Sequence, residues 1–220
     1  MRSYIKALIF DLDGTLADTI SAITEAINMT MEELSLPTHT EQEVRTYINH
    51  GPRHLISEAI PHEAREHDPS IEDRALDIYN KNYAKTYMHT DKLYDGMEQV
   101  VLELSKYYKI AVLSNKQDEY VKALVRQLLP EGICEIACGS LDGVPAKPSP
   151  TIAKKIIEAL GVEHYECMLI GDSDIDILTA KNAEIDILSV SWGYATKTKL
   201  VHHGAEEIVN SPEELLEYFK

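Results

Sequence analysis

The feature that most constrains the fold of this chain is a regular alternation of strand-like and helix-like segments after residue 95. Short apolar runs rich in β-forming residues alternate with segments whose apolar residues recur every three or four positions. The expected strands span 109–115, 133–138, 166–172, 185–190 and 206–210, and the expected helices span 96–108, 119–129, 149–160, 176–183 and 211–219. This order predicts an α/β fold, a doubly wound parallel sheet with helices on both faces.

A first strand is predicted well before this region, in the apolar run IKALIFD at 5–11. The run is long enough for a strand and too short for a helix. Residues 18–88 contain helical patterns without a strand, so they indicate a four-helix unit inserted after the first strand. We therefore expect a Rossmann-like core formed by residues 1–16 and 90–220, and a helical-bundle cap formed by residues 17–89.

Each helix of the inserted unit has its own sequence signal. The first is an apolar stripe at three- and four-residue spacing, made of Ile20, Ile23, Ile27, Met31 and Leu34. Thr40 and Glu43 form a capping box for a second helix that ends near Gly51. Pro52 suits the first position of a third helix, and a fourth is expected to begin at Ser70.

Composition restricts the class of partner. The chain has 220 residues, of which 21 are basic and 37 acidic, a net charge of −16. Nucleic acids and anionic membranes select a basic surface, so we expect neither as a partner. No apolar run approaches the roughly 18–20 residues that span a bilayer. The N-terminal segment also lacks the apolar core of a signal peptide, so a cytoplasmic protein is expected.

The three cysteines do not indicate a metal site. An odd number of cysteines without a secretion signal is typical of reduced thiols. Cys134 and Cys138 lack a second pair of Cys or His at zinc-site spacing. Their alternation in ICEIAC favours positions on a strand.

Polar side chains follow the expected strands at the edge where open parallel sheets bind ligands. They are Asp11 and Asp13 after the first strand, Ser114 and Asn115 after 109–113, Asp172 and then Asp176 after 167–171, and Lys147 in a loop before a helix. Carboxylates this close repel unless a cation lies between them or one carries a proton. The set predicts phosphoryl transfer through a carboxylate nucleophile.

Each of these residues then has an expected role. Asp11 would attack phosphorus, while Asp13 would protonate the leaving oxygen and later deprotonate water. The phosphoryl oxygens would be held by the backbone of the turn at Gly14 and Thr15, by Asn115, and by Ser114 and Lys147. Two alternatives stay open: Ser114 as a cap for a helix near Asp118, and Lys147 as a solvated loop residue.

Hard oxygen ligands in the same set favour Mg²⁺ as the cofactor. Asp172 and Asp176, with one oxygen of Asp11, would bind it, and Asp13 is included in the candidate metal-binding set. The cation would also allow several carboxylates to remain ionised together. Asp174 is expected to cap a helix or face solvent, and His202 and His203 are expected at the surface.

Four motifs together resemble those of the haloacid dehalogenase-like (HAD) hydrolases. They are DLDGT at 11–15, SN at 114–115, the lysine of KPSP at 147 and GDSDID at 171–176. Their order and spacing resemble members with a small helical cap after the first motif. The segments YDGMEQVVLEL, VLSNK, KPSPTIAKKIIEALGV, SVSWGYAT and NSPEELLEYF further resemble the phosphoglycolate phosphatase-type branch.

The resemblance implies the same roles for the catalytic residues. It also implies Mg²⁺ bound by Asp11, Asp172 and the backbone carbonyl of Leu12, with Asp176 supporting the metal directly or through water. The chain departs from the family at Glu184, where glycine is usual. This departure bears on the shape of that turn and not on the catalytic set.

The expected function is Mg²⁺-dependent hydrolysis of a small phosphorylated metabolite by a monomer or homodimer, with phosphoglycolate as the best single substrate. Pyrophosphate, a nucleotide or a sugar phosphate remains open, and so does a phosphomutase. A dehalogenase, a phospho-accepting signalling domain and a non-catalytic binding protein are disfavoured. In the cap, Arg53 or His54 either contacts the leaving group or is exposed at a helix start. Lys116 lies beside the catalytic loop that contains Ser114, and whether it contacts the substrate is equally open.

Overall fold

The computed structural model describes residues 4–90 and 92–220, and the chain divides into two compact units. The first contains Met1–Asp18 with Lys92–Lys220, and the second contains Thr19–Asp91. Both connections between the two units lie two residues later than the boundaries expected from the sequence. The reason is a short antiparallel ladder in which β2 (Ala17–Asp18) pairs with β3 (Lys92–Leu93), so these residues belong to the first unit.

The first unit contains a six-stranded sheet. Its strands are β1 (Ala7–Phe10), β4 (Lys109–Gln117), β5 (Cys134–Ser140), β6 (Cys167–Gly171), β7 (Asp186–Val190) and β8 (Ile208–Val209). They lie in the order β5-β4-β1-β6-β7-β8, and every neighbouring pair is parallel. The doubly wound parallel sheet is therefore confirmed. Strand order reverses between β1 and β6, and ligands of such sheets bind at that position.

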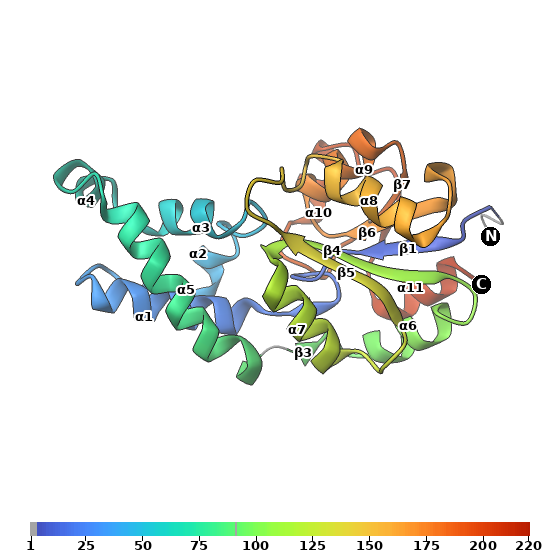
Figure 1. Ribbon diagram of the computed structural model, residues 1–220, viewed down its shortest axis with the longest axis horizontal. Coiled ribbons are helices and arrows are strands. Elements are labelled where there is room, and N and C mark those ends of the chain that lie inside the picture. Colours follow the sequence, from blue (N-terminus) through green and yellow to red (C-terminus); the bar gives the residue numbers. More distant parts are fainter. Residues whose placement is uncertain (1–3, 91) are drawn as a thin grey trace. The chain divides into compact units, whose positions relative to one another are not determined.

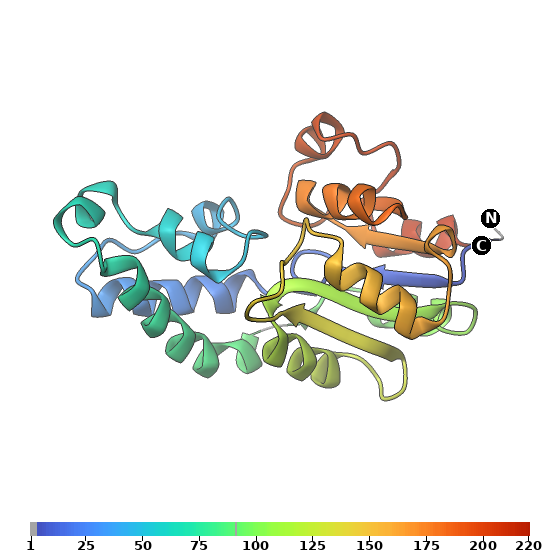
Figure 2. The same cartoon turned by 45° about the horizontal axis from the view of Figure 1, so that its top comes forward.

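Helices cover both faces of this sheet (Figure 1, Figure 2). On one side lie α6 (Met97–Leu104), α7 (Asp118–Leu128) and α11 (Pro212–Tyr218), and on the other lie α8 (Thr151–Leu160) and α9 (Asp174–Ala183). All four residues of β1 are buried, as expected for a strand covered on both faces. Ala7 and Ile9 of β1 join the apolar cluster under α8 and α9, with Ile152 and Ile156.

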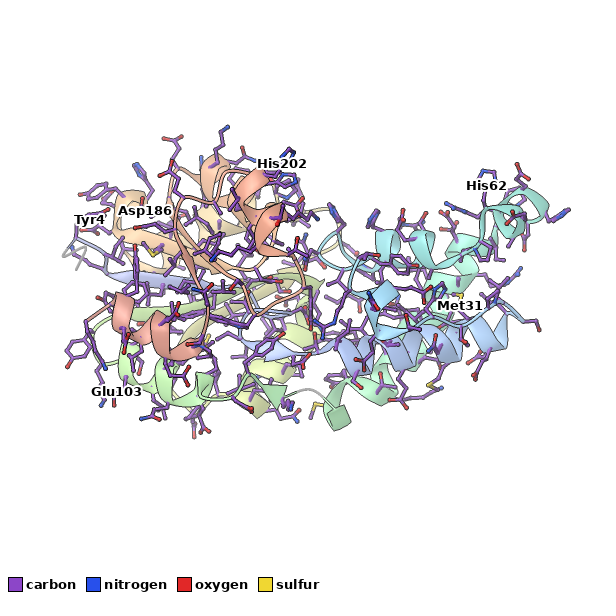
Figure 3. The ribbon with its side chains drawn as sticks, turned by 180° about the vertical axis from the view of Figure 1, so that it is seen from behind. Tyr4, Met31, His62, Glu103, Asp186 and His202 are labelled. Atoms are coloured by element: carbon purple, nitrogen blue, oxygen red, sulfur yellow. The ribbon has the colours of Figure 1, made fainter. Side chains whose placement is uncertain are left out.

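The ends of the strands away from the switch point carry a different kind of contact. The Tyr4 hydroxyl donates a hydrogen bond to the Asp186 carboxylate at 2.8 Å, joining the segment before β1 to the start of β7 (Figure 3). Cys134 and Cys138 lie in β5, as expected, and all three thiols are free. Across residues 4–90 and 92–220, none of the helices combines the length and the apolar character that crossing a bilayer requires.

Every regular element among the described residues of the second unit is a helix. It contains α1 (Ile20–Glu33), α2 (Glu41–Val44), α3 (Pro52–Ala59), α4 (His62–His67) and α5 (Ile71–Thr90). α1 and α5 pack along each other and share a buried polar contact, in which the Asn82 amide donates to Thr30 Oγ1 at 3.4 Å and to Glu33 at 3.1 Å. Tyr79 and Tyr83 stack their rings on α5, with centroids 5.7 Å apart.

The expected helix starts are confirmed, but the expected number of helices is wrong. Thr40 and Glu43 form the capping box of α2, and Pro52 occupies the first turn of α3. α2 ends at Val44 because the following residues form turns, and Asn49 adopts φ 89°. α4 is an additional helix that the sequence pattern missed.

Glu184 stands where the family usually has glycine, and it adopts the same backbone conformation. It closes α9 with φ 59° and ψ 41°, the left-handed conformation in which glycine is usual. The turn therefore keeps its shape, at a conformational cost of about 1–2 kcal/mol for a residue with a side chain.

Candidate active site

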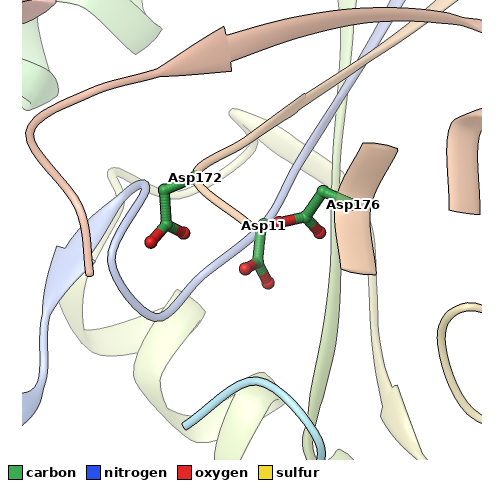
Figure 4. Close-up of side chains that lie close together, drawn as sticks. All are labelled: Asp11, Asp172 and Asp176. Atoms are coloured by element: carbon green, nitrogen blue, oxygen red, sulfur yellow. The ribbon is translucent and has the colours of Figure 1, made fainter. Parts of the chain in front are cut away.

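Three carboxylates converge at the switch point between β1 and β6. Asp11 directly follows β1, Asp172 directly follows β6, and Asp176 lies in the first turn of α9. One oxygen of each lies within 4.8 Å of the others (Figure 4). The residues are 4%, 0% and 0% exposed, respectively. Parallel strands that end at one edge account for this convergence, which the sequence pattern predicted.

The two oxygens of Asp11 differ in their surroundings. Oδ1 accepts hydrogen bonds from the Leu12 backbone N–H at 2.8 Å and lies 2.9 Å from the Lys147 ammonium. Oδ2 has no hydrogen-bond donor among the residues that the structure describes. One oxygen is thus anchored while the other keeps its lone pairs available for attack on an electrophile.

Asp172 is held by the turn after β1 and by the loop after β7. Its Oδ1 accepts from the Thr15 hydroxyl at 3.0 Å, and its Oδ2 accepts from the Tyr194 backbone N–H at 2.7 Å. The Trp192 indole N–H donates to the Thr15 carbonyl at 3.1 Å, which joins the same two segments. The sequence pattern had not identified the loop residues Trp192 and Tyr194.

Two glycines permit the close approach of these segments. A Cβ on Gly193 would lie 2.3 Å from the Gly14 carbonyl oxygen and 2.4 Å from Asp172 Cβ. Gly14 has φ +85°, and a Cβ there would lie 2.6 Å from Asp172 Oδ2. A side chain at either position would therefore displace the Asp172 carboxylate.

The turn after Asp11 uses its own backbone N–H groups internally. The Gly14 N–H donates to the Ala17 carbonyl at 2.9 Å, and the Thr15 N–H donates to the Leu12 carbonyl at 3.3 Å. Both donors are used within the turn, so Gly14 and Thr15 shape the site, and the Thr15 hydroxyl orients Asp172. Their contact with phosphoryl oxygens stays a prediction.

The same turn removes Leu12 from the candidate metal-binding set. Its carbonyl oxygen accepts from three backbone N–H groups, those of Thr15, Leu16 and Ala17, at 3.3, 3.1 and 2.9 Å. A carbonyl oxygen has two lone pairs, so one that already accepts three hydrogen bonds is poorly placed to bind a metal ion.

Lys147 is a buried member of the cluster and not a solvated loop residue. Its ammonium lies 2.6 Å from Asp176 Oδ1 and 2.9 Å from Asp11 Oδ1. The Asn115 amide fixes the Lys147 backbone, since it donates to the Lys147 carbonyl at 2.9 Å and accepts from its N–H at 2.8 Å. Asn115 thus positions Lys147, and its expected contact with the substrate stays a prediction.

Asp13 lies in a second ionic group beside the carboxylate cluster. Its Oδ1 is 2.5 Å from the Lys116 ammonium, and its Oδ2 accepts from the Ser114 hydroxyl at 3.2 Å. The Asp13 carboxylate is not among the three carboxylates that could share a metal ion, so its placement favours acid–base chemistry. Ser114 points to Asp13 and does not cap α7, whose N-cap is Gln117.

Burial and mutual repulsion change the protonation of the cluster. Burial, followed by the charge of Asp176, raises the pKa of Asp11 well above its usual value. The same two causes raise the pKa of Asp172 to about 7. Burial disfavours the charged form of Lys147, but the carboxylates of Asp11 and Asp176 outweigh it and raise the pKa of that ammonium. The carboxylates thus carry more negative charge than Lys147 offsets.

This donor set fits a hard divalent cation. Three carboxylates offer oxygens close enough to share one ion, and Mg²⁺ prefers oxygen ligands. A cation between them would reduce the repulsion that raises the pKa values of Asp11 and Asp172. Asp174 lies outside the cluster and pairs with Lys199 at 2.9 Å. It does not cap α9, whose N-cap is Ser173, and its side chain is only 13% exposed.

The remaining candidates lie in the helical unit. Arg53, at the start of α3, is exposed, and its guanidinium donates to the Asp73 carboxylate at 2.8 Å. The His54 ring packs against that of His50, with centroids 4.7 Å apart. Arg53 and His54 are therefore not among the residues that the first unit brings together around Asp11.

Comparisons with known proteins define the class of this chain. The family model for haloacid dehalogenase-like hydrolases matches residues 8–190. A phosphoglycolate phosphatase from Aquifex aeolicus is 31% identical over 86% of each chain, and one from Colwellia psychrerythraea is 28% identical over 96% of this chain and 95% of its own length. A crystal structure from Lactobacillus delbrueckii subsp. bulgaricus, described provisionally as a phosphoglycolate phosphatase, is 31% identical and covers 97% of both chains with a TM-score of 0.88.

The chain belongs to the haloacid dehalogenase-like hydrolases. Within that family its relatives place it in the phosphoglycolate phosphatase-like branch, so the expected resemblance is confirmed. The expected enzyme class, a phosphatase of this family, is confirmed by the same matches.

Proposed function

We propose that this chain is a Mg²⁺-dependent phosphatase that hydrolyses a small phosphate monoester through a phosphorylated Asp11, with phosphoglycolate as its substrate. The observation that carries the proposal is the environment of Asp11. One carboxylate oxygen is held by Lys147 and by the backbone, and the other has no donor among the described residues. An anchored carboxylate with an available oxygen is suited to nucleophilic attack.

The first half of the reaction transfers the phosphoryl group to the protein. Asp11 Oδ2 attacks phosphorus, and the bond from phosphorus to the ester oxygen breaks. Asp13 gives its proton to the leaving oxygen, because a group two residues beyond the nucleophile is positioned to reach the opposite side of the phosphorus. Lys147, with its ammonium 2.9 Å from Asp11, offsets charge on the phosphoryl oxygens.

The second half restores Asp11. The ionised Asp13 removes a proton from water, the water oxygen bonds to phosphorus, and the bond from phosphorus to Asp11 breaks. Inorganic phosphate leaves, and Asp13 again carries the proton. Asp11, Asp172 and Asp176 would hold Mg²⁺, which when bound supplies positive charge between the carboxylate nucleophile and the anionic phosphate.

The names of the relatives support phosphoglycolate as the substrate. The curated relatives from Aquifex aeolicus and Colwellia psychrerythraea are phosphoglycolate phosphatases that match this chain over most of its length. At 28–31% identity, chemistry is shared more readily than leaving-group preference. The substrate therefore needs a direct test.

The test measures phosphate release from a panel that contains phosphoglycolate, pyrophosphate, a nucleoside monophosphate and a hexose phosphate, with Mg²⁺ or with excess chelator. We expect phosphoglycolate to be hydrolysed best, and only with Mg²⁺. Asp11→Asn should reduce turnover at least 10³-fold. Asp174→Asn is the control, because Asp174 lies in the same segment as Asp172 and Asp176 but pairs with Lys199 outside the cluster.

Four outcomes would contradict the proposal. Appreciable turnover by Asp11→Asn would exclude Asp11 as the nucleophile, and full activity in chelator would exclude the metal dependence. A profile in which another ester exceeds phosphoglycolate would replace the substrate. A phosphorylated chain that transfers its phosphoryl group to a sugar phosphate in preference to water would identify a mutase.

A further inference from the structure

Lys116 places a second ammonium in the site, with no part in the reaction described so far. Its side chain is 6% exposed, and its Nζ lies 2.5 Å from Asp13 Oδ1. Lys147 lies instead against Asp11 and Asp176. The two lysines therefore serve different sides of the site, Lys147 beside the nucleophile and Lys116 beside the acid–base residue.

The position of Lys116 relates it to the leaving group. A general acid lies about 2.6–3.2 Å from the oxygen that it protonates, so the ester oxygen is close to Asp13. In a phosphorylated 2-hydroxy acid the carboxylate oxygens are three bonds from that ester oxygen, about 3–4 Å away. An ammonium in contact with the Asp13 carboxyl is then within reach of the substrate carboxylate.

Charge makes such a contact necessary for an anionic leaving group. The site holds four aspartates, Asp11, Asp13, Asp172 and Asp176, all nearly or fully buried. A substrate carboxylate in this site would be repelled by the ionised aspartates, and charges interact more strongly at a buried site than in water. The Lys116 ammonium places positive charge beside Asp13, on the side where the leaving group would depart.

Stability alone gives little reason for a lysine at this position. The free energy lost when two charges are removed from water offsets most of the attraction between them, so a buried ion pair contributes little net stability. Here the Lys116 and Asp13 side chains are only 6% and 9% exposed. The pair is better explained by an interaction that it makes with the substrate.

We propose that Lys116 is a specificity-determining residue that binds a carboxylate on the leaving group, carried by the carbon next to the ester oxygen. It selects phosphorylated 2-hydroxy acids over esters of neutral alcohols. This inference rests on the proposed function, since it takes Asp13 as the group that protonates the leaving oxygen.

The test compares two esters that differ only in the carboxylate, phosphoglycolate and ethyl phosphate. The quantity measured is the ratio of their kcat/KM values for the wild type, Lys116→Met and Lys116→Arg. Lys106→Met is the matched control, because Lys106 is 56% exposed and pairs with Glu103 at the surface. Lys116→Gln, which keeps a donor for Asp13, replaces the methionine variant if the latter does not fold.

We expect the wild type to prefer phosphoglycolate and Lys116→Met to reduce that ratio at least tenfold. Both rates should fall in this variant because Asp13 loses a partner, but a purely structural role would lower both equally. Lys116→Arg should keep part of the preference, and Lys106→Met all of it.

Two results would overturn the inference and are distinguishable. If the wild type prefers phosphoglycolate and Lys116→Met keeps the ratio, Lys116 does not recognise the carboxylate, while the proposed function stands. If the wild type hydrolyses both esters equally well, both the inference and the proposed substrate are wrong.

Discussion

At the scale of single residues, the site depends on how closely the loop after β7 approaches the turn after β1. Gly193 makes that approach possible, because a Cβ there would fall 2.3 Å from the Gly14 carbonyl oxygen. The next residue, Tyr194, donates its backbone N–H to Asp172. A change of one methyl group at Gly193 therefore acts on Asp172 without altering any charged residue.

We predict that Gly193→Ala lowers phosphatase activity about 10²-fold, since displacement of a positioned group by about 1 Å has effects of that size. Overpacking should also reduce the free energy of unfolding by about 1–3 kcal/mol. Steady-state assays at several Mg²⁺ concentrations would measure the first effect, and denaturant unfolding the second. The Mg²⁺ concentration for half-maximal activity should rise, because Asp172 is displaced.

Gly132→Ala is the control for the backbone effect of removing a glycine. Gly132 has φ +82°, but a Cβ there would meet no atom within 4 Å. It should lose about 1–2 kcal/mol of stability from the left-handed conformation alone and keep its activity. Wild-type activity in Gly193→Ala would show that the loop does not position Asp172.

The sequence identified the charged residues of the site better than the contacts between them. Asp11, Asp172 and Asp176 were predictable, because strand ends and the first turn of a helix are local features. The contact between Gly193 and Asp172 depends on packing between distant segments, which no local pattern records. For the same reason the internal use of the Gly14 N–H was not foreseen.

At the scale of elements, the pairing of α1 with α5 includes a polar group in an apolar interface. Asn82 is 1% exposed, and its amide donates to Thr30 and Glu33 of α1 and accepts from Lys85 at 2.9 Å. Thr86, one turn later, donates to the Ala22 carbonyl at 3.1 Å. These bonds fix the register between the two helices in a way that apolar contacts alone do not.

We predict that Asn82→Ala destabilises the helical unit by about 1–3 kcal/mol, because the partners of Asn82 lose a buried hydrogen bond. Thermal and denaturant unfolding monitored by circular dichroism would measure the loss. Lys81→Ala is the control, since Lys81 is exposed on the same helix. Equal stability of the two variants would mean that solvent replaces the bonds of Asn82.

Elements with a buried apolar stripe were predictable, and those without one were not. α8 was expected, and it buries Ile152, Ile156 and Leu160 on one face. α4 was missed because none of its residues is buried, so its sequence HEAREH has no apolar periodicity. The strands β2 and β3, of two residues each, are too short for an alternating pattern to be recognised.

At the scale of the whole molecule, the chain is strongly acidic, with a net charge of −16, and three of its carboxylates are buried together in one cluster. Burial raises the pKa of Asp172 from 3.8 to about 7, so the folded chain holds that proton more tightly than the unfolded chain does. Its contribution to stability is present below pH 3.8 and is lost as the pH rises through about 7. A metal ion requires the ionised form, so its effect on stability has the opposite dependence.

We predict that Mg²⁺ raises the melting temperature of this protein more at pH 8 than at pH 5.5. Each kcal/mol of binding energy corresponds to about 2–4 °C for a chain of this size. Thermal unfolding in excess Mg²⁺ and in chelator, at both pH values, would measure the difference. Asp172→Asn should lose most of it, because the variant lacks the titrating carboxylate. An identical increase at both pH values would contradict the assigned metal site.

The ladder between β2 and β3 has a consequence for how such a chain can be altered. Ala17 lies opposite Leu93, and paired antiparallel residues are about 4.5–5.5 Å apart, so the two crossings leave the first unit side by side. An insert joined through adjacent ends can be shortened, lengthened or exchanged while the sheet keeps both of its attachment points. Residues 17–18 and 92–93 are therefore suitable junctions for recombination or protein engineering. A different helical unit could be inserted there while the catalytic residues stay the same.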